Sequence, residues 1–300
     1  MNNLQGRVAV ITGAGSGFGL EAARIAAREG MKVVLVDVQA DALDRAAAEV
    51  RGAGALALVQ RVDVSDAAAM DALGAAVHER YGAPHFVFNN AGVAGGGLIW
   101  EHSAAAWQWI LGVNLMGVAH GVRVFTPMML AAARADAAYR GHIVNTASMA
   151  GLVNMPNMGA YNVSKHAVVS LTETLFQDLK LVTEQVHCSV LCPYFVPTGI
   201  HQSDRNRPAG LADAAGPTQS QQVAQAMSAK AVTAGKVSAA EVAQRVFDAM
   251  RERRFYIYSH PQAIGVVRQR MEDILQGREP SDPYAERPEV GERLRNALRG

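Results

Sequence analysis

The sequence predicts an α/β fold, a doubly wound parallel sheet of about seven strands with helices on both faces. Three observations predict it. Short, continuously apolar segments alternate with Ala-rich segments of helical periodicity, a glycine-rich turn joins the first apolar segment to a helix, and 50% of the 300 residues are apolar, enough for one large core. Because crossovers between parallel strands are right-handed, we expect ligands at the carboxyl ends of the strands.

The expected elements follow one another along the chain. Cys188 and Cys192 fall in one apolar strand without neighbouring His or Cys residues, so we interpret them as core residues and expect no metal site. The expected strands are 8–12, 33–37, 55–63, 85–89, 142–147, 187–192 and 255–258, and the expected helices include 19–29, 41–52, 161–182, 219–233 and 263–275.

Two segments depart from this alternation. Residues 199–236 are polar and rich in Ala, Gly, Pro and Gln, which predicts either a mobile lid over the strand ends or a surface decoration. The helix 263–275 leads into a Pro- and charge-rich tail, 278–300, that we expect to pack on a partner subunit or to be disordered. We therefore expect a single domain over residues 1–262, followed by a C-terminal helix and tail over 263–300.

Charge and hydropathy exclude several classes of protein. The net charge is +1 and the charged residues are interspersed, which argues against nucleic acid as a partner. The polar start, residues 1–7, leaves no room for a signal peptide. No apolar run approaches the roughly 20 residues that span a bilayer as a helix. We therefore expect a soluble, cytoplasmic protein with no membrane partner.

A glycine turn follows the first strand. Residues Thr12 to Gly19 read TGAGSGFG and lead directly into a helix. Glycines let the backbone turn sharply and approach a pyrophosphate, while a helix N-terminus offers free N–H groups and the positive end of a dipole. Because the strand and the helix supply the context that a glycine pattern alone lacks, we predict a dinucleotide-binding site rather than a flexible turn.

Acidic residues end the second and third strands. Asp37 can accept hydrogen bonds from the adenosine ribose hydroxyls and would repel a 2′-phosphate. No Arg or Lys lies within the glycine turn, so NAD(H) is favoured over NADP(H). The alternative is an Asp that ends a strand or caps the next helix. Asp63 and Val64 predict either a carboxylate beside the adenine or, equally well, a helix cap.

Three further residues predict acid–base chemistry. Tyr161 and Lys165 lie one turn apart at the start of a helix, so both can act on one substrate atom. An adjacent ammonium lowers the pKa of a phenol from its reference value of about 10. Ser148, at a strand end, can hold a substrate oxygen in line with the phenol. Singly these residues are more often surface neighbours and a cap, but beside a dinucleotide turn they predict hydride exchange with an alcohol.

From Val8 to about Thr198 the chain resembles the short-chain dehydrogenase/reductase family, which has a Rossmann fold. The matching motifs are the glycine turn at 12–19, Asn-Asn-Ala-Gly at 89–92 and Tyr-x-x-x-Lys at 161–165. The resemblance implies dimers or tetramers that pair long helices, here 104–130 and 161–182.

The resemblance also implies roles for individual residues. Asn114 would join Ser148, Tyr161 and Lys165 in the catalytic set, holding a water that links the lysine to solvent as a proton relay. Lys165 would also bind the nicotinamide ribose, and Thr198 the carboxamide. The residues expected at the cofactor are Gly13, Gly15, Ser16, Gly17, Phe18, Gly19, Asp37, Asp63, Val64, Asn90, Ala91, Gly92, Tyr161, Lys165, Pro193, Val196 and Thr198.

Two segments differ from the family pattern. After Pro193 the family usually has glycine, whereas this chain has Tyr194, which we expect to border the substrate pocket and to favour a flat or aromatic substrate. Met149 and Met155 are expected at the same pocket, although core packing explains them equally well. Residues 134–140, more polar than usual in the family, are interpreted as a surface loop.

These observations predict an NAD-dependent oxidoreductase that interconverts a secondary alcohol and a ketone, with a hydrophobic or aromatic substrate. Two alternatives remain. An isomerase, epimerase or dehydratase would keep its NAD bound through turnover, and a non-catalytic NAD-binding sensor or scaffold would use the same fold without a reaction.

Overall fold

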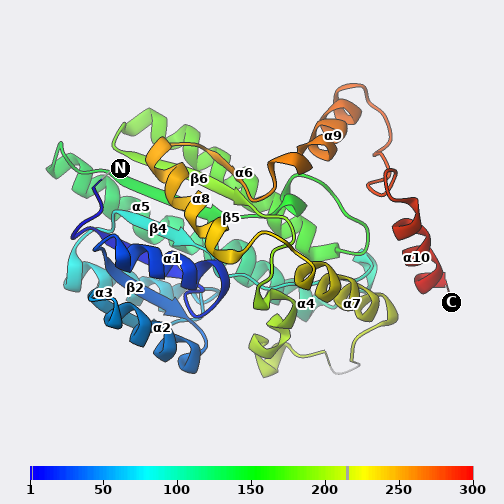
Figure 1. Ribbon diagram of the computed structural model, residues 1–300, viewed down its shortest axis with the longest axis horizontal. Helices are drawn as coiled ribbons and strands as arrows, with labels where there is room; N and C mark the ends of the chain where they lie inside the picture. Colours follow the sequence, from blue (N-terminus) through cyan, green and yellow to red (C-terminus); the bar gives the residue numbers. More distant parts are fainter. Residues whose placement is uncertain (2, 214–215, 300) are drawn as a thin grey trace.

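The computed structural model describes residues 1, 3–213 and 216–299, and within them seven strands form one parallel sheet (Figure 1). The strand order is β3-β2-β1-β4-β5-β6-β7, so the chain winds from β1 toward one edge and then from β4 toward the other. The predicted fold class is confirmed, with every strand end within two residues of its expected position. The strands are β1 Val8–Thr12, β2 Lys32–Asp37, β3 Ala57–Arg61, β4 Phe86–Asn89, β5 Gly141–Thr146, β6 Val186–Cys192 and β7 Tyr256–Tyr258.

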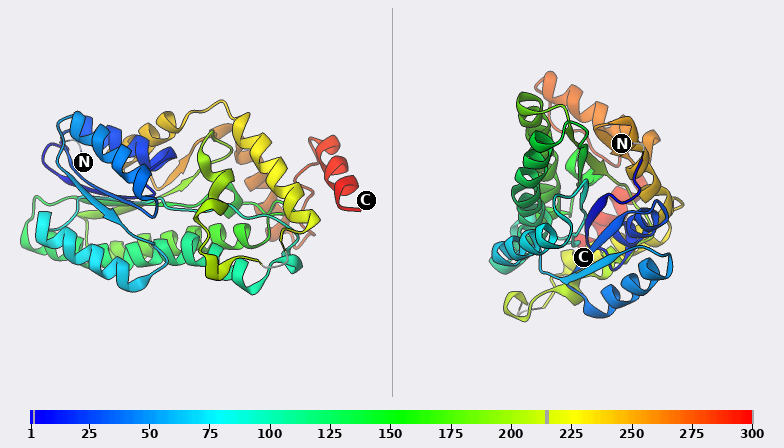
Figure 2. Two further views of the ribbon diagram at one scale, coloured as in Figure 1. Left: turned by 90° about the horizontal axis from the view of Figure 1, so that it is seen from below. Right: turned by 90° about the vertical axis from the view of Figure 1, so that its left-hand side faces the viewer.

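Helices cover both faces of the sheet, as the edge-on view of Figure 2 shows. One layer consists of α1 Gly17–Arg28, α2 Ala40–Gly52 and α8 Ala239–Glu252; the other consists of α3 Ala67–Tyr81, α4 Ala104–Leu111, α5 Gly117–Ala135 and α6 Gly159–Val182. Strand side chains alternate between the layers: Ile11 and Phe88 pack in the core on the α1 side, and Val10 and Val87 in the core on the α5 side. This two-sided burial explains why the strands are apolar throughout.

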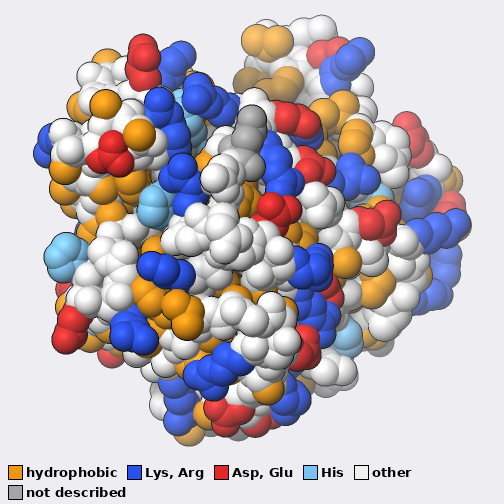
Figure 3. All heavy atoms as spheres, turned by 60° about the vertical axis from the view of Figure 1, so that its left-hand side comes forward, with side chains coloured by type: hydrophobic (Ala, Val, Ile, Leu, Met, Phe, Trp, Pro, Cys, Tyr) orange, Lys and Arg blue, Asp and Glu red, His pale blue; other side chains and the backbone are white. Residues whose placement is uncertain are grey.

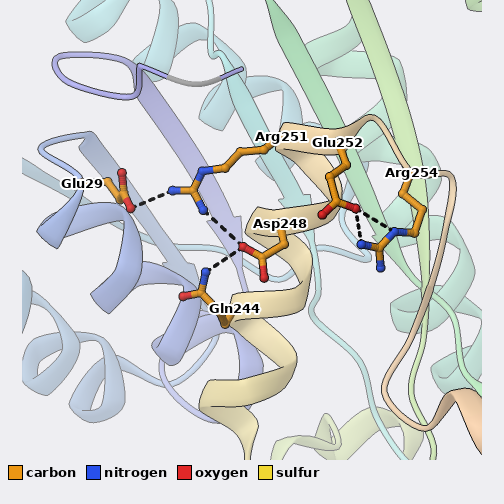
Figure 4. Close-up of polar contacts among 6 residues, drawn as sticks. All are labelled: Glu29, Gln244, Asp248, Arg251, Glu252 and Arg254. Atoms are coloured by element: carbon orange, nitrogen blue, oxygen red, sulfur yellow. Dashed lines mark hydrogen bonds and ion pairs between the residues drawn. The ribbon is translucent and has the colours of Figure 1, made fainter.

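Polar contacts join α1 to α8 at the rim of their layer (Figure 4). Arg251 donates from Nη2 to Oε1 of Glu29, the residue after α1, at 2.7 Å, and from Nη1 to Oδ1 of Asp248 at 3.4 Å. Because these groups are partly exposed, each pair contributes about 1 kcal/mol or less. The apolar contact between α1 and α8 is therefore the larger contribution to this layer.

One helical run in the described part of the chain, Ala104–Ala135, is long and apolar enough by length and composition to cross a membrane. The expectation that no apolar stretch reaches that length is therefore wrong. The run comprises α4, the π-helical turn Gly112–Met116 and α5. Phe125 and Met129 of α5 are fully buried against the sheet. Packing in the core accounts for the apolar side chains on this face of the run.

The C-terminal segment differs from the expected tail. After α9 (Gly265–Leu275) the chain forms another helix, α10 (Pro288–Arg299), which packs on α7 (Gln219–Thr233) at the right of Figure 1. Gln219 Nε2 donates to the carbonyl oxygen of Ala297 at 2.8 Å, and Leu294 is buried. Frequent charges in the sequence concealed this amphipathic helix.

Residues 134–140 form a surface loop only in part. Helix α5 continues to Ala135, and the side chain of Tyr139 is buried, with its hydroxyl donating to the carbonyl oxygen of Pro84. This hydrogen bond links the segments that precede β5 and β4. Elsewhere on the surface, acidic and basic side chains are interspersed, as the face in Figure 3 shows.

A chain of buried polar groups joins β4, β5 and α6 behind the strand ends. Asn89 Nδ2 donates to Asn145 Oδ1 at 2.8 Å, and Asn145 Nδ2 donates to Thr172 Oγ1 at 3.1 Å. Gly121 of α5 lies against the Asn89 amide so closely that a Cβ atom at position 121 would overlap it. The absence of a side chain at Gly121 therefore sets how closely α5 approaches the end of β4.

We expect Gly121→Ala to lower the free energy of unfolding by about 2 kcal/mol, because the added methyl group must displace a buried amide. Urea denaturation would measure the change. The control is Gly52→Ala in α2, where a Cβ atom meets nothing within 4 Å; there we expect a gain of about 0.5 kcal/mol from helix propensity. Equal effects of the two substitutions would contradict the packing argument.

Candidate active site

The carboxyl ends of the strands border a cleft that is partly open to solvent. It lies where the direction of winding changes between β1 and β4, the place expected for a ligand in an open α/β sheet. Most residues expected at the cofactor line it: Gly13, Ser16, Gly17, Phe18, Asp37, Asp63, Val64, Asn90, Ala91, Gly92, Tyr161, Lys165, Pro193 and Thr198.

The glycine turn forms one wall of the cleft and needs glycine for two different reasons. Gly13 has φ +66°, a backbone conformation that side chains disfavour. Gly19, in the first turns of α1, lies so close to Gly13 that a Cβ atom would collide with its carbonyl oxygen. Helix α1 begins at Gly17, two residues earlier than expected, so its N-terminal N–H groups lie at the cleft. The turn is thus shaped to accept an anion.

Hydrogen bonds hold this turn to the end of β4. Thr12 Oγ1 accepts from the backbone N–H groups of Asn90 and Ala91 at 2.9 and 3.1 Å. The Asn90 side chain returns the contact, donating from Nδ2 to the carbonyl oxygen of Thr12 at 3.1 Å. Asn90 lines the cleft, but its amide is committed to bracing the turn.

Asp37 braces the backbone around it and also lies in the cleft lining, where its contact with a ribose stays a prediction. Its Oδ2 accepts from the backbone N–H of Gly15 at 2.9 Å, and its Oδ1 from that of Gln39 at 3.0 Å. The carboxylate therefore fixes the glycine turn and the entry to α2, and it also lines the cleft. Asp63 likewise lines the cleft while accepting from the N–H and hydroxyl of Ser65, at 2.9 and 2.7 Å.

Tyr161 lines the cleft, and Ser148 lies beside it as a buried residue outside the lining. Tyr161 lies in the first turn of α6, and Ser148 follows β5 directly. Burial raises the pKa of the Tyr161 phenol above its usual value, and a hydrogen bond with the Ser148 hydroxyl offsets part of the rise. The Ser148 hydroxyl also lies 3.4 Å from the carbonyl oxygen of Pro193. The net direction is opposite to the lowering expected from a neighbouring lysine, so the phenol is neutral at pH 7.

Lys165 is buried at 2% exposure and donates from Nζ to the carbonyl oxygen of Thr146 at 2.9 Å. Burial lowers the pKa of its ammonium to about 8. The Nζ atom lies 5.7 Å from the centre of the Tyr161 ring. At this distance, inside the protein, burial outweighs the influence of the ammonium on the phenol.

Asn114 lies in the π-helical turn between α4 and α5 and is fully buried. Its Oδ1 accepts from the N–H of Val93 at 2.8 Å, while its Nδ2 donates to the Val93 carbonyl oxygen at 3.0 Å and to Ser164 Oγ at 3.2 Å. The side chain therefore joins the loop after β4 to α6 and does not line the cleft. Its expected part in a proton relay stays a prediction.

Several expected site residues lie outside the cleft lining. Val196 is a core residue, and Gly15 and Gly19 support the turn from behind. Tyr194 is 40% exposed; its ring packs edge-on against those of Phe195 and His260, at 4.8 and 5.7 Å between centres. Met149 is buried in a core cluster and Met155 is half-buried. The substrate role expected for Tyr194, Met149 and Met155 therefore stays a prediction.

The segment after β6, which the sequence predicts as a lid or a surface decoration, supplies lining residues that the sequence did not single out. The 3-10 helix Gly199–Asn206 crosses the cleft: Ser203 Oγ accepts from the N–H of Ala94 at 2.8 Å, and the Asn206 side chain accepts from that of Gln39. These contacts join residues more than a hundred positions apart without any periodic pattern. The lining residues missed are Val38, Gln39, Val62, Val93, Trp109, Val113, Thr146, Ala147, Gly199, Ile200, Ser203, Arg205 and Asn206.

Helix α7 closes onto the loop after β4 through Ser220. The Ser220 hydroxyl accepts from the N–H of Leu98 at 2.9 Å and donates to Glu101 Oε2 at 2.7 Å. The Ser220 carbonyl oxygen accepts from Asn157 Nδ2 at 3.0 Å, four residues before Tyr161. Two glycines admit the helix: Cβ atoms at Gly96 and Gly97 would lie 2.5 Å from Ala224 Cβ and 2.7 Å from Gln221 Cγ.

Comparisons with known proteins identify relatives of this chain. A family model described as short chain dehydrogenase matches residues 7–209. A dehydrogenase/reductase of CLA biosynthesis from Lactiplantibacillus plantarum is 33% identical over 278 residues, covering 92% of this chain and 95% of that protein.

Solved structures agree in fold. A crystal structure of a short-chain dehydrogenase/reductase from Burkholderia phymatum in complex with NAD is 53% identical, with a TM-score of 0.91 over 94% of this chain and 99% of that one. A metagenomic short-chain oxidoreductase in complex with NADP is 33% identical, with a TM-score of 0.59 over 64% of this chain and 84% of that one. Both nicotinamide dinucleotides therefore occur among the relatives.

We expect Lys165→Met to stabilise the folded protein at pH 7 by about 2 kcal/mol. Burial of the ammonium destabilises the folded wild type by about 3 kcal/mol, and the variant is free of this penalty. The variant also leaves the Thr146 carbonyl oxygen without its hydrogen-bond donor, which destabilises it by about 1 kcal/mol. Because the lysine pKa is lower folded than unfolded, the penalty is complete below pH 8 and disappears as pH rises toward 10.5. Urea denaturation at pH 7 and pH 10 would measure this; a gain that does not shrink at the higher pH would contradict the burial argument.

Proposed function

The chain belongs to the short-chain dehydrogenase family, and on that premise we propose that it interconverts a secondary alcohol and a ketone by hydride transfer with NAD(H). The observation that carries the proposal is that Tyr161 and Lys165 line the cleft together, with Nζ 5.7 Å from the centre of the phenol ring and Ser148 beside the phenol. A proton donor, a hydrogen-bonding hydroxyl and a cation at one point can together handle one substrate oxygen.

The dinucleotide supplies the hydride in reduction and accepts it in oxidation. Tyr161 is proposed as the general acid and base: its neutral phenol gives a proton to the ketone oxygen in reduction, and its phenolate takes the hydroxyl proton in oxidation. Ser148 orients that oxygen by a second hydrogen bond. Because burial keeps the phenol protonated at neutral pH, the arrangement is prepared for reduction, and oxidation should be favoured by higher pH.

Lys165 is proposed to bind the nicotinamide ribose and to stabilise the phenolate when it forms. Its pKa of about 8 means that the charge is present at neutral pH and is lost above that value. Asn114 is proposed to support a proton path from Lys165 to solvent. It couples the loop after β4 to α6, so it also keeps Lys165 and Tyr161 at a fixed position relative to the cleft.

NAD(H) is proposed as the dinucleotide because the Asp37 carboxylate lines the cleft at the end of β2, where it would repel a 2′-phosphate. Arg61, the basic residue that ends β3, donates to the carbonyl oxygen of Val38 and lies outside the cleft lining. The NAD complex of the Burkholderia phymatum relative supports the same assignment. The glycine turn agrees with membership of this family, because its shape leaves room for a pyrophosphate.

The substrate is proposed to be hydrophobic or aromatic, because Trp109, Val93, Val113 and Ile200 line the cleft. Residues 199–236 are proposed to act as a lid, since the parts of this segment in the structure cross the cleft. A homodimer or homotetramer and a cytoplasmic location are proposed because they are common among members of the family. The alternatives, an epimerase or dehydratase that retains NAD and a non-catalytic sensor, predict no net formation of NADH.

We expect Tyr161→Phe to reduce kcat at least a thousandfold while changing the Kd for NADH less than threefold, because the substitution removes the proton donor and leaves the ring. Turnover of a panel of secondary alcohols and titration of NADH fluorescence would measure the two quantities. Tyr256→Phe, outside the cleft lining, is the control and should keep wild-type turnover. Full activity of Tyr161→Phe would rule out the assigned role.

We expect Asp37→Ser to narrow the preference for NADH over NADPH at least tenfold, because the substitution removes the charge that repels a 2′-phosphate. Titration of both reduced dinucleotides with the wild type and the variant would measure the ratio of dissociation constants. A Ser hydroxyl can still accept one backbone N–H bond, which limits damage to the turn. The assignment of NAD fails if the wild type binds NADPH as tightly as NADH.

A further inference from the structure

The charged side chains that line the cleft include few cations that could balance the negative charge of a dinucleotide. Among the described lining residues, four carry charge: Asp37, Asp63, Lys165 and Arg205. A pyrophosphate bound at the glycine turn is an anion that must enter beside two carboxylates. Lys165 is buried at the reacting end and already donates to the Thr146 carbonyl. Arg205 is therefore the remaining lining cation that can compensate a pyrophosphate.

A short series of contacts places Arg205 near the glycine turn. A Cβ atom built on Gly17 would lie 3.3 Å from Thr198 Cγ2, so the turn and the start of the covering segment are in contact. The next residue is Gly199, on which a Cβ atom would lie 3.4 Å from Arg205 Nη2. The guanidinium of Arg205 thus lies against Gly199, the residue after Thr198. It is beside the wall of the cleft where a helix N-terminus accepts an anion.

Arg205 is held in place without its charge being neutralised. Its Nη1 donates to the carbonyl oxygens of Gly199 and Gln202, at 3.2 and 2.7 Å, within the same 3-10 helix. Among the described residues it forms no ion pair, whereas Arg207, two positions later, pairs with Asp213 at 2.9 Å. A positioned guanidinium with unused N–H groups is suited to phosphate oxygens, which it can bind in a bidentate manner.

The rest of the 3-10 helix spans the cleft on either side of this point. Ser203 is tied to Ala94 after β4, and Asn206 to Gln39 after β2. Gln39 lies two residues beyond Asp37, at the end of the cleft assigned to the adenosine ribose. Along the chain Arg205 therefore lies between the two anchoring residues, Ser203 and Asn206, which contact the loops after β4 and β2.

We propose that Arg205 binds the pyrophosphate of the dinucleotide, so that the segment Gly199–Asn206 closes on the cofactor as well as over the substrate. This inference rests on the proposed binding of a nicotinamide dinucleotide to the cleft. It adds a cation from the covering segment to the backbone N–H groups of the glycine turn. Binding of the dinucleotide then favours the closed segment even before a substrate arrives.

The test measures binding and needs no substrate. The Kd of NADH, NADPH, ADP-ribose and adenosine would be compared among wild type, Arg205→Gln, Arg205→Lys and the control Arg134→Gln, by fluorescence titration and competition. We expect Arg205→Gln to weaken NADH and ADP-ribose equally, by about tenfold, and to leave adenosine unchanged. Arg205→Lys should restore most of the affinity, and Arg134→Gln, on an exposed residue of α5, should behave as wild type.

Four outcomes would overturn the inference. Unchanged NADH affinity in Arg205→Gln would show that the guanidinium does not contact the cofactor. An equal loss of affinity for adenosine would place its effect at the nucleoside, and a selective loss for NADPH would place it at the 2′-phosphate. Failure of the wild type to bind any dinucleotide would overturn the proposed function together with this inference, so the two failures are distinguishable.

Discussion

The site depends on the close approach of the β1–α1 turn to the end of β4. Thr12 and Asn90 hold this approach with reciprocal hydrogen bonds between side chains and backbone, and glycines on the turn make it sterically possible. The winding of the sheet changes direction between these two strands, so the same contact lies at the wall of the cleft that the glycine turn forms. The buried amides behind it, Asn89 and Asn145, join β4, β5 and α6 and so fix the start of α6, from which Tyr161 reaches the cleft.

The reacting groups are held at a cost to stability. An ammonium with 2% exposure and a phenol whose pKa is raised by burial are both poorly solvated, and among the described residues neither is paired with a carboxylate. The same poor solvation is useful in a hydride-transfer site, since a dry phenol keeps its proton until a substrate oxygen takes it. The sequence suggested that a lysine would tune the tyrosine by charge alone. The structure adds burial as the larger influence on both groups.

The fold, the glycine turn and the positions of Tyr161 and Lys165 could be predicted because their sequence signals are local. Apolar strands, the glycine turn and the spacing of Tyr161 and Lys165 are each visible within a few residues, and each fixes a local geometry. Arg205, Ser203 and Asn206 could not be found in this way, because their partners lie across the cleft and their segment has no periodicity. Helix α10 was missed because its charges hide one apolar stripe. A long helix over 104–130 was expected from the family resemblance, but the apolar character of the α4–α5 run was missed because Pro127 and polar residues interrupt its composition without ending the helix.

The fit of α7 against Gly96 and Gly97 limits how this protein could acquire new substrates through mutation. A larger residue at either glycine would press on Ala224 or Gln221 of α7, and through Ser220 and Asn157 the displacement would reach the start of α6. Substitutions on the loop after β4 are therefore constrained by the catalytic helix. Changes on α7 itself meet no such constraint from the sheet. Divergence in specificity should accumulate on that helix first, while the glycine pair stays unchanged.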